Sequence, residues 1–135
     1  MNGEPDLIAV VVCEDVLANP SGRLTLYNLF QDLTADRFPA VFPRLHVVTT
    51  WYNPMPEPAR AVIQAGIVAP DGTAIGNAAA TITVAPNAYH TQISRFQGLI
   101  FPVPGDYRVQ VQRGSRQVCD LPLVVVAPEE EREER

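Results

Sequence analysis

The chain has 135 residues, of which 47% are hydrophobic and 19% are charged, and its formal net charge is -5 at pH 7. A chain of this length and balance is expected to bury a single core without stabilising disulfides or metals. The acidity disfavours a general affinity for nucleic acid or for anionic membrane surfaces, and no apolar run is long enough to span a bilayer as a helix.

The two ends of the chain are polar. The first six residues are acidic and lack the basic start of a secretory signal, so we expect a cytoplasmic protein. The last seven residues contain five Glu and two Arg and contribute -3 to the net charge. We predict one β-sandwich domain over residues 1–127 and an acidic, solvated tail over residues 128–135.

The first half of the chain contains three segments with the pattern of strands. Residues 7–12 form an unbroken apolar run, which is typical of a strand covered on both faces. After a turn signal, residues 23–30 alternate with Leu24, Leu26 and Phe30 among the inward candidates, and we expect these two segments to pair. Residues 38–43 hold two Phe-Pro dipeptides and are predicted to connect strands without joining a ladder, because proline lacks an N–H donor.

Residues 45–52 alternate again, and the pattern does not show which face points inward. Three prolines in the next six residues predict a stiff loop. Residues 61–67 and 78–84 alternate on either side of a turn at residues 70–73. The segment 89–101 follows, with a bulge predicted at its only glycine, Gly98.

The clearest pattern is a hairpin over residues 106–127. Tyr107, Val109 and Val111 share one side of the first strand, and polar residues occupy the other side. Gly114 and Ser115 supply the turn, and the return strand is apolar and β-branched. We expect this hairpin to close one edge of a sandwich.

About seven to eight strands with frequent turn signals, and no helical pattern of useful length, predict an all-β fold, an antiparallel immunoglobulin-like β-sandwich. Residues 31–37 and 87–95 leave room for one short helical turn. Residues 7–12 and 123–127 are apolar on both faces, which is more than a two-layer sandwich needs. Homodimerisation through an outer face or edge would explain this surplus, and so would cover from the Phe-Pro connection.

Few residues could support catalysis. Cys13 as a nucleophile would need His46 or His90 as a base and Asp15 as the orienting group, because a thiolate requires a nearby imidazole to lower its pKa. No glycine-rich oxyanion turn follows Cys13, so we expect a protein that is not an enzyme. The two histidines have no CxxC or HxxxH partner, and we therefore expect no metal and no other cofactor. Cys13 and Cys119 are expected to be unbonded, buried thiols.

One group of candidate interaction residues is aromatic and lies near the strand 45–52. Trp51 and Tyr52, with Tyr89 and His90, would form a platform of the kind that binds sugars. A single Trp at strand spacing is more often part of the core.

The second group lies on the Phe-Pro connection. Phe38 and Phe42 are held on a proline-stiffened segment, so they would lose little entropy on docking to a protein partner. The alternative is that they fold back as a lid over the end of the sandwich. We favour a binding or structural interaction module whose partner is a protein or a second copy of the chain. A carbohydrate-binding module is the alternative, and a cysteine-dependent enzyme using Cys13 comes third.

Several short motifs follow one another along residues 13–45. They are an apolar strand that ends in Cys13-Glu14-Asp15, a strand that begins Gly22-Arg23-Leu24, and the stretches Phe38-Pro39 and Phe42-Pro43-Arg44-Leu45. In these motifs the chain resembles an uncharacterised bacterial family of small immunoglobulin-like β-sandwich proteins, and the turn at residues 70–72 fits as well. Members of that family usually carry a glycine near Asn28. The resemblance implies the sandwich fold and implies no activity for any residue.

Overall fold

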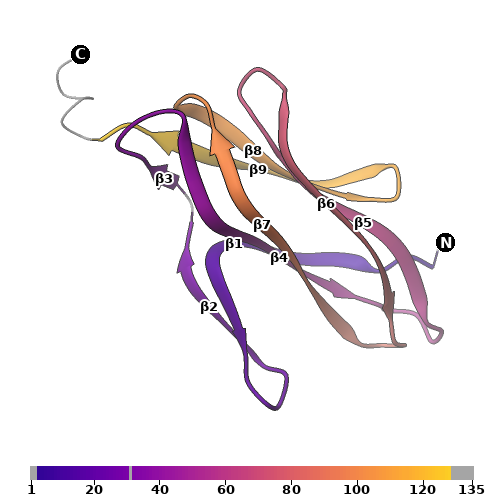
Figure 1. The fold of residues 1–135 in the computed structure, drawn as a ribbon. Helices are drawn as coiled ribbons and strands as arrows, with labels where there is room; N and C mark the ends of the chain where they lie inside the picture. The colour runs from indigo at the N-terminus through magenta and orange to yellow at the C-terminus, as the bar shows by residue number, and fades with distance from the viewer. Residues whose placement is uncertain (1–2, 31, 129–135) are drawn as a thin grey trace.

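The computed structural model describes residues 3–30 and 32–128 of the chain, and within those ranges every regular element is a β-strand. Four strands form one sheet in the order β2-β1-β4-β7, and five form a second sheet in the order β3-β9-β8-β5-β6 (Figure 1). The strands are β1 (Asp6–Ala18), β2 (Leu24–Leu29), β3 (Asp32–Thr34), β4 (Ala40–Tyr52), β5 (Ala59–Val68), β6 (Ala74–Val84), β7 (Tyr89–Phe101), β8 (Gly105–Arg113) and β9 (Arg116–Val126).

The all-β prediction is confirmed, with nine strands in the described ranges instead of seven or eight. The pairing is antiparallel except between β3 and β9, which run parallel. The exception arises because the chain leaves the four-stranded sheet after β2 and joins the other sheet beside β9. Neither of the two segments considered for a helical turn contains a helix in its described part. The acidic tail beyond residue 128 lies outside the described residues.

The main core lies between the two sheets. On β4 the side chains of Leu45, Val47 and Trp51 point inward and are fully buried. Alternate side chains of β5 and β8 meet them from the opposite sheet, as the period of two predicts. Among the described residues there is no helix with the length and apolar character needed to cross a membrane.

The outer face of β4 is also covered, which explains why the sequence did not show its inward face. The second half of β1 pairs with β2, and this hairpin lies over the outer side of the four-stranded sheet. There Val16 packs with Val48, and Leu24 and Leu26 pack against them. Pairing of the two segments is confirmed, but Leu24 and Leu26 face this small outer cluster instead of the main core. Phe30 does pack against the main core.

The prediction that residues 38–43 stay out of the ladder is wrong. β4 begins at Ala40 and pairs with β7 on both sides of Pro43. At this point the other edge of β4 has no neighbour, because β1 pairs with β4 only as far as His46. A proline is tolerated where its missing donor leaves no ladder bond unmade.

Gly98 lies opposite Pro43, and the register between β4 and β7 does not shift there, so the bulge predicted at Gly98 is absent. Instead Gly98 has a φ of 64°. On β7 the buried side chains are at even-numbered positions up to Phe96 and at odd-numbered positions from Leu99 onward, so the face that points inward changes at this glycine. The left-handed backbone is accessible to glycine without the strain that a Cβ would introduce.

The first strand is less covered than expected. Ile8 is 54% exposed, and the register between β1 and β4 shifts between Leu7 and Ala9. The prediction that residues 7–12 are covered on both faces is therefore wrong. The hairpin over residues 106–127 is confirmed as β8 and β9, but it does not close an edge, since β5 flanks it on one side and β3 on part of the other.

Two buried polar side chains form hydrogen bonds to the backbone of loops at the ends of the sandwich. The side-chain amide of Asn53 donates to the carbonyl oxygens of Glu57, Val84 and Ala85. Near the start of β8, the Tyr107 hydroxyl donates to the Val103 carbonyl at 2.7 Å and accepts from the Val103 N–H at 3.3 Å. Each side chain thus pairs backbone groups that would otherwise be left unsatisfied in loops.

Candidate interaction site

The residues considered for cysteine catalysis are brought together in part. Cys13 on β1 lies directly opposite His46 on β4 in the strand register, and Asp15 follows two residues later. His90 lies elsewhere, opposite Trp51 near the other end of β4.

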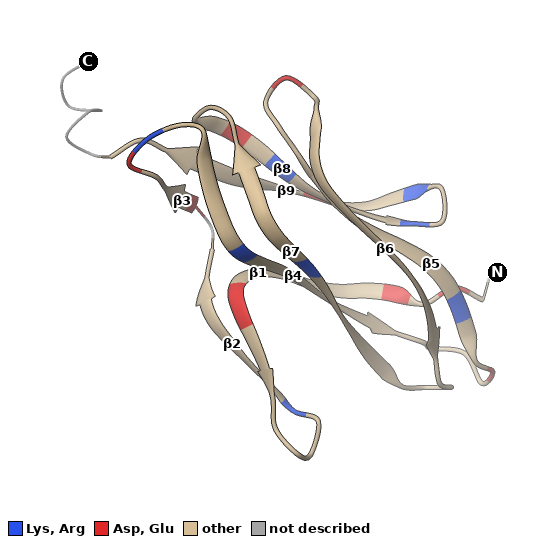
Figure 2. Ribbon diagram, in the orientation of Figure 1, with Lys and Arg blue, Asp and Glu red and all other residues tan. Residues whose placement is uncertain are grey.

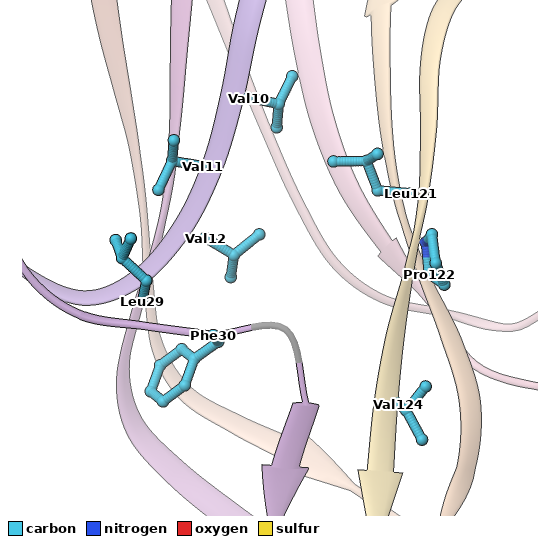
Figure 3. Close-up of a pocket in the computed structure, with 8 residues that line it drawn as sticks. All are labelled: Val10, Val11, Val12, Leu29, Phe30, Leu121, Pro122 and Val124. Carbon is cyan, nitrogen blue, oxygen red and sulfur yellow. The ribbon is translucent and has the colours of Figure 1, made fainter.

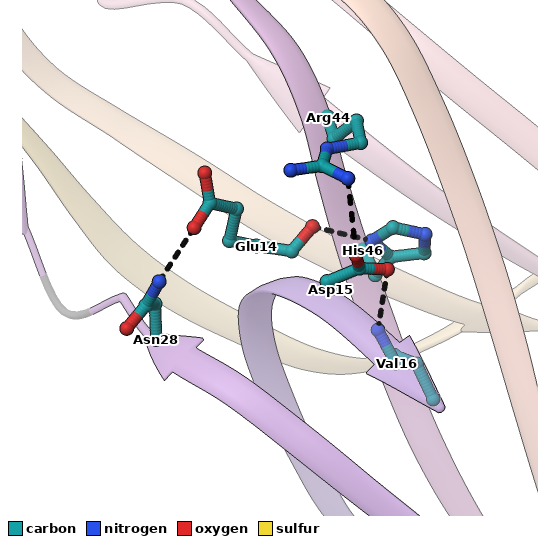
Figure 4. A network of polar contacts seen from close by, with 6 residues as sticks. All are labelled: Glu14, Asp15, Val16, Asn28, Arg44 and His46. Carbon is teal, nitrogen blue, oxygen red and sulfur yellow. Dashed lines mark hydrogen bonds and ion pairs between the residues drawn. The ribbon is translucent and has the colours of Figure 1, made fainter. Parts of the chain in front are cut away.

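The surroundings of these groups do not favour a nucleophile. Cys13 is fully buried, and burial, followed by the negative charge of Asp15, raises the pKa of its thiol. His46 Nδ1 lies 2.9 Å from the Glu14 carbonyl oxygen. Asp15 accepts from its neighbouring backbone N–H and pairs with Arg44 at 3.1 Å (Figure 4). Imidazole and carboxylate are therefore engaged in holding the β1–β2 hairpin to β4.

We expect the buried thiol to be inert in the folded protein. Iodoacetamide should modify Cys13 at least about 100-fold more slowly in the native state than in urea, because its thiolate is disfavoured and shielded. Cys119 is only partly buried and should react faster than Cys13. Mass spectrometry of peptides after timed labelling measures both rates. Equal native rates for the two thiols would contradict this assignment, and unfolded, unreduced protein should show two free thiols.

In the described ranges no three His, Cys, Asp or Glu side chains are grouped so that they could hold a metal ion. Both cysteines are free.

The residues of the predicted aromatic platform do not lie on one surface. Trp51 is fully buried, and its indole N–H donates to Thr49 Oγ1 at 2.9 Å, so it belongs to the core. Tyr52 instead pairs with Tyr89, with ring centroids 4.8 Å apart and planes tilted by 47°. Tyr89 also lines a groove of about 760 Å³ between the β1–β2 hairpin and β7. Its other lining residues are Gly22, Arg23, Leu24, Leu26, Val48, Thr50, His90, Thr91 and Ile93.

Phe38 and Phe42 fold back onto the protein. Both are partly buried and pack against the main core. The Phe42 ring meets Phe101 edge-on, with centroids 5.2 Å apart and planes at 76°. This arrangement corresponds to the lid alternative, in which the two rings cover the end of the sandwich.

An apolar groove, which we call the seam, runs between β1 and β9 (Figure 3). Its volume is about 370 Å³, and none of its eight lining residues has a polar side chain. A smaller groove of about 180 Å³ extends it toward the N-terminal end of β1. The seam is lined by Val10, Val11, Val12, Leu29, Phe30, Leu121, Pro122 and Val124.

The seam is open because neither sheet is completed on this side. β2 pairs with β1 only from Cys13 onward, and the Phe30 N–H then donates to the Val12 carbonyl. On the facing sheet, β3 pairs with β9 only from Val124 onward. Before these points each strand has a neighbour on one side only, so apolar side chains from both sheets face a gap. Leu29, which is 63% exposed, stands at its rim.

The sequence carried one signal of this site. The apolar surplus of residues 7–12 indicated a surface that needs cover. The facing residues of β9 could not be identified, because the approach of the two strands is a property of the topology.

Comparison with known proteins gives a family and a fold. Residues 8–126 match a family described as Family of unknown function (DUF6941). No curated protein matches the chain.

Three solved structures are similar in fold. A β-D-glucoside glucohydrolase from Trichoderma reesei is 14% identical, with a TM-score of 0.57 over 91% of this chain and 19% of that one. A β-glucosidase from Listeria innocua is 14% identical, with a TM-score of 0.55 over 92% and 16%. The alkylpurine DNA glycosylase AlkC from Pseudomonas fluorescens, bound to DNA containing an abasic site analog, is 13% identical, with a TM-score of 0.52 over 72% and 28%. The chain spans less than a third of each protein, and the likeness concerns the fold alone.

Proposed function

The chain belongs to the family of unknown function DUF6941, and we propose that it is a non-catalytic interaction module whose seam binds apolar side chains of a partner protein. The observation that carries this proposal is the seam itself, an open groove of about 370 Å³ whose lining side chains are all apolar. Apolar side chains gathered in one open groove can be buried by the side chains of a partner. The buried, protonated Cys13 supports a role other than catalysis.

The seam suits side chains better than an added strand. Pro122 removes a hydrogen-bond donor from the free edge of β9, and the register shift after Leu7 interrupts the free edge of β1. A partner strand would therefore find no continuous ladder on either rim. A Leu, Ile, Met or Phe side chain entering the groove would bury its surface against both sheets, which is how interface hot spots bind.

Replacing Leu29 by Asp tests this proposal. Leu29 is largely exposed, so the substitution should leave the fold intact while placing a charge at the rim of the seam. A partner captured by the wild-type chain from its native cells should bind Leu29→Asp about 30-fold more weakly in calorimetry. Ile100→Asp is the matched control, because Ile100 is similarly exposed but lies on β7. The proposal fails if Leu29→Asp binds like the wild type, or if Ile100→Asp loses as much affinity.

The tyrosine pair favours carbohydrate as a second candidate ligand, at a different place. Tyr89 is 67% exposed, contacts the ring of Tyr52 at a tilt and borders the groove beneath the β1–β2 hairpin. Exposed aromatic faces beside hydroxyl side chains can stack on sugar rings. Trp51, being buried, takes no part in such a site.

We propose further that the sandwich is immunoglobulin-like. In that fold a tyrosine near the start of one strand donates its hydroxyl back to the backbone a few residues upstream. Tyr107, which bonds to Val103 where the chain crosses from β7 to β8, has this geometry. The two free thiols support a reducing, cytoplasmic location, and the resemblance of the sequence motifs supports a bacterial source.

A further inference from the structure

The free edge of β6 is a second surface open to interaction. β6 is the outermost strand of the five-stranded sheet and is hydrogen-bonded to β5 alone. It has 11 residues, and none of them is proline. None of them is charged, so the whole strand is tan in Figure 2. A long, uncharged strand edge offers a row of free N–H and C=O groups to another chain, and natural proteins usually interrupt such edges.

In the described part of the chain, the free edges of β1, β2, β3, β7 and β9 are short or interrupted. β2 and β3 have only six and three residues, and Asn28 in β2 has a left-handed backbone. On β7 the left-handed Gly98 breaks the alternation. The free part of β9 contains Asp120 and Pro122, and the register of β1 shifts near its start. β6 has a register shift near its start, between Ala74 and Gly76, and beyond it keeps a regular ladder with β5 from Gly76 to Val84, without a charged residue, a proline or a left-handed residue.

We propose that β6 pairs antiparallel with β6 of a second copy of the chain about a twofold axis. With Ala80 on the axis, Ala78 falls opposite Ile82 on the inner face, and Ala79 falls opposite Thr81 on the outer face. Inner residues then meet inner residues, as continuous sheets require. Both of these pairs join alanine to a β-branched side chain, and no register brings like charges together because β6 has no charged residue.

The self-complementary pattern selects a second copy over an unrelated partner. An isologous contact needs one patch that fits itself, and the uncharged sequence of β6 does so in register. The two five-stranded sheets would become one continuous sheet. Each chain carries a net charge of -5, so repulsion opposes association and added salt should strengthen it.

Dimerisation through β6 goes beyond the proposed binding at the seam. β6 and β9 lie on opposite sides of the β8–β5 pair in the sheet order, so a dimer would leave both seams free. A dimer would therefore present two partner sites, and a partner with two copies of its motif would gain avidity.

Thr81→Lys tests the dimer in the full chain by sedimentation equilibrium. The wild-type mass should rise from one chain toward two with concentration, and more so at higher salt. Thr81 is exposed on the outer face of β6, and Lys there would place two cations close together across the axis. We expect dimerisation to weaken at least about 10-fold. The added Lys also makes each chain less negative overall, which by itself would favour association, so the expected loss comes from the two cations at the interface.

Thr91→Lys, on the exposed face of β7, is the matched control and should dimerise like the wild type. Leu29→Asp should also dimerise normally, which separates this test from that of the seam. Circular dichroism confirms that the variants fold. The proposal is overturned if the wild-type chain keeps the mass of one chain at about 1 mM, or if the Thr81 and Thr91 variants behave alike.

Discussion

Replacing Asn53 by Ala should lower the free energy of unfolding by about 3 kcal/mol or more. Asn53 is fully buried, and its Nδ2 donates to the carbonyls of Glu57 at 2.7 Å, Val84 at 3.1 Å and Ala85 at 3.2 Å. Its Oδ1 accepts from the Met55 N–H at 2.9 Å. Alanine would leave these backbone groups without partners in a buried place. Urea unfolding should show a lower midpoint with an unchanged slope.

Asn53→Asp is the sharper comparison. Asp keeps the side-chain volume and the oxygen that accepts from the Met55 N–H, but it places a carboxylate oxygen against three carbonyl oxygens. Because these oxygens repel one another, Asn53→Asp should be less stable than Asn53→Ala at pH 7. Burial raises the pKa of such a carboxyl above its unfolded value of about 3.9. Stability is then retained below that pH and lost as the pH rises through the folded pKa.

The exposed Asn77→Ala should change stability by less than about 0.5 kcal/mol. If Asn53→Asp were as stable as the wild type at neutral pH, the assigned orientation of the amide would be wrong.

The strands that sequence reasoning located best are those whose two faces differ. In β5, β6 and β8, one face is buried and the other is solvated, and the period of two reports that difference directly. Gly72 with a φ of 91° occupies the turn between β5 and β6, which was predicted at residues 70–73. Local pattern and local turn chemistry agree in these segments, so little tertiary information is needed.

The errors arose where a distant neighbour decides the outcome. Pro43 is compatible with β4 only because β1 has already turned away, which no local pattern reveals. Val48 reads as an inward residue as easily as Val47 does, because the β1–β2 hairpin buries it from outside. Each case depends on strands far apart in the sequence.

Asn28 shows how a resemblance can carry structural information. The similar family usually has glycine near this position, and Asn28 has a φ of 54°. Asparagine is the ordinary residue that best tolerates the left-handed region, so the local backbone is kept without glycine. Its side-chain amide also donates to the Glu14 carboxylate across the hairpin (Figure 4).

The sequence indicated an apolar surface that needs cover, but it did not show where in the fold this surface would lie. An excess of apolar residues near the N-terminus indicated a surface that needs cover, either from a second copy of the chain or from the Phe-Pro connection. The other wall of the seam is β9, which lies more than a hundred residues later in the chain. The aromatic residues that attract attention in the sequence are mostly structural. Phe42 and Trp51 contribute to packing, and the exposed rings are those of tyrosines.

Trp51→Ala should lower the free energy of unfolding by about 3–5 kcal/mol, the range for truncating a large buried aromatic. The ring is fully enclosed and packs in a cluster with Ile63, Val84 and Val111 from the five-stranded sheet. Its removal would open a cavity at one end of the core and leave Thr49 Oγ1 without its indole donor. Thermal and urea unfolding at low protein concentration measure the loss.

Two further variants serve as comparisons. One separates the stability lost with the volume of the Trp51 ring from that lost with its hydrogen bond, and the other tests the outer face of β4. Trp51→Phe keeps much of the ring and should lose less than Trp51→Ala, since only part of the cavity and the single indole bond are involved. Tyr52→Ala removes a ring from the opposite face of β4 and should change stability by about 1 kcal/mol or less, although it breaks the contact with Tyr89. If Tyr52→Ala were the more damaging of the two alanine variants, the inward face assigned to β4 would be reversed, and Trp51 would return as a candidate ligand platform.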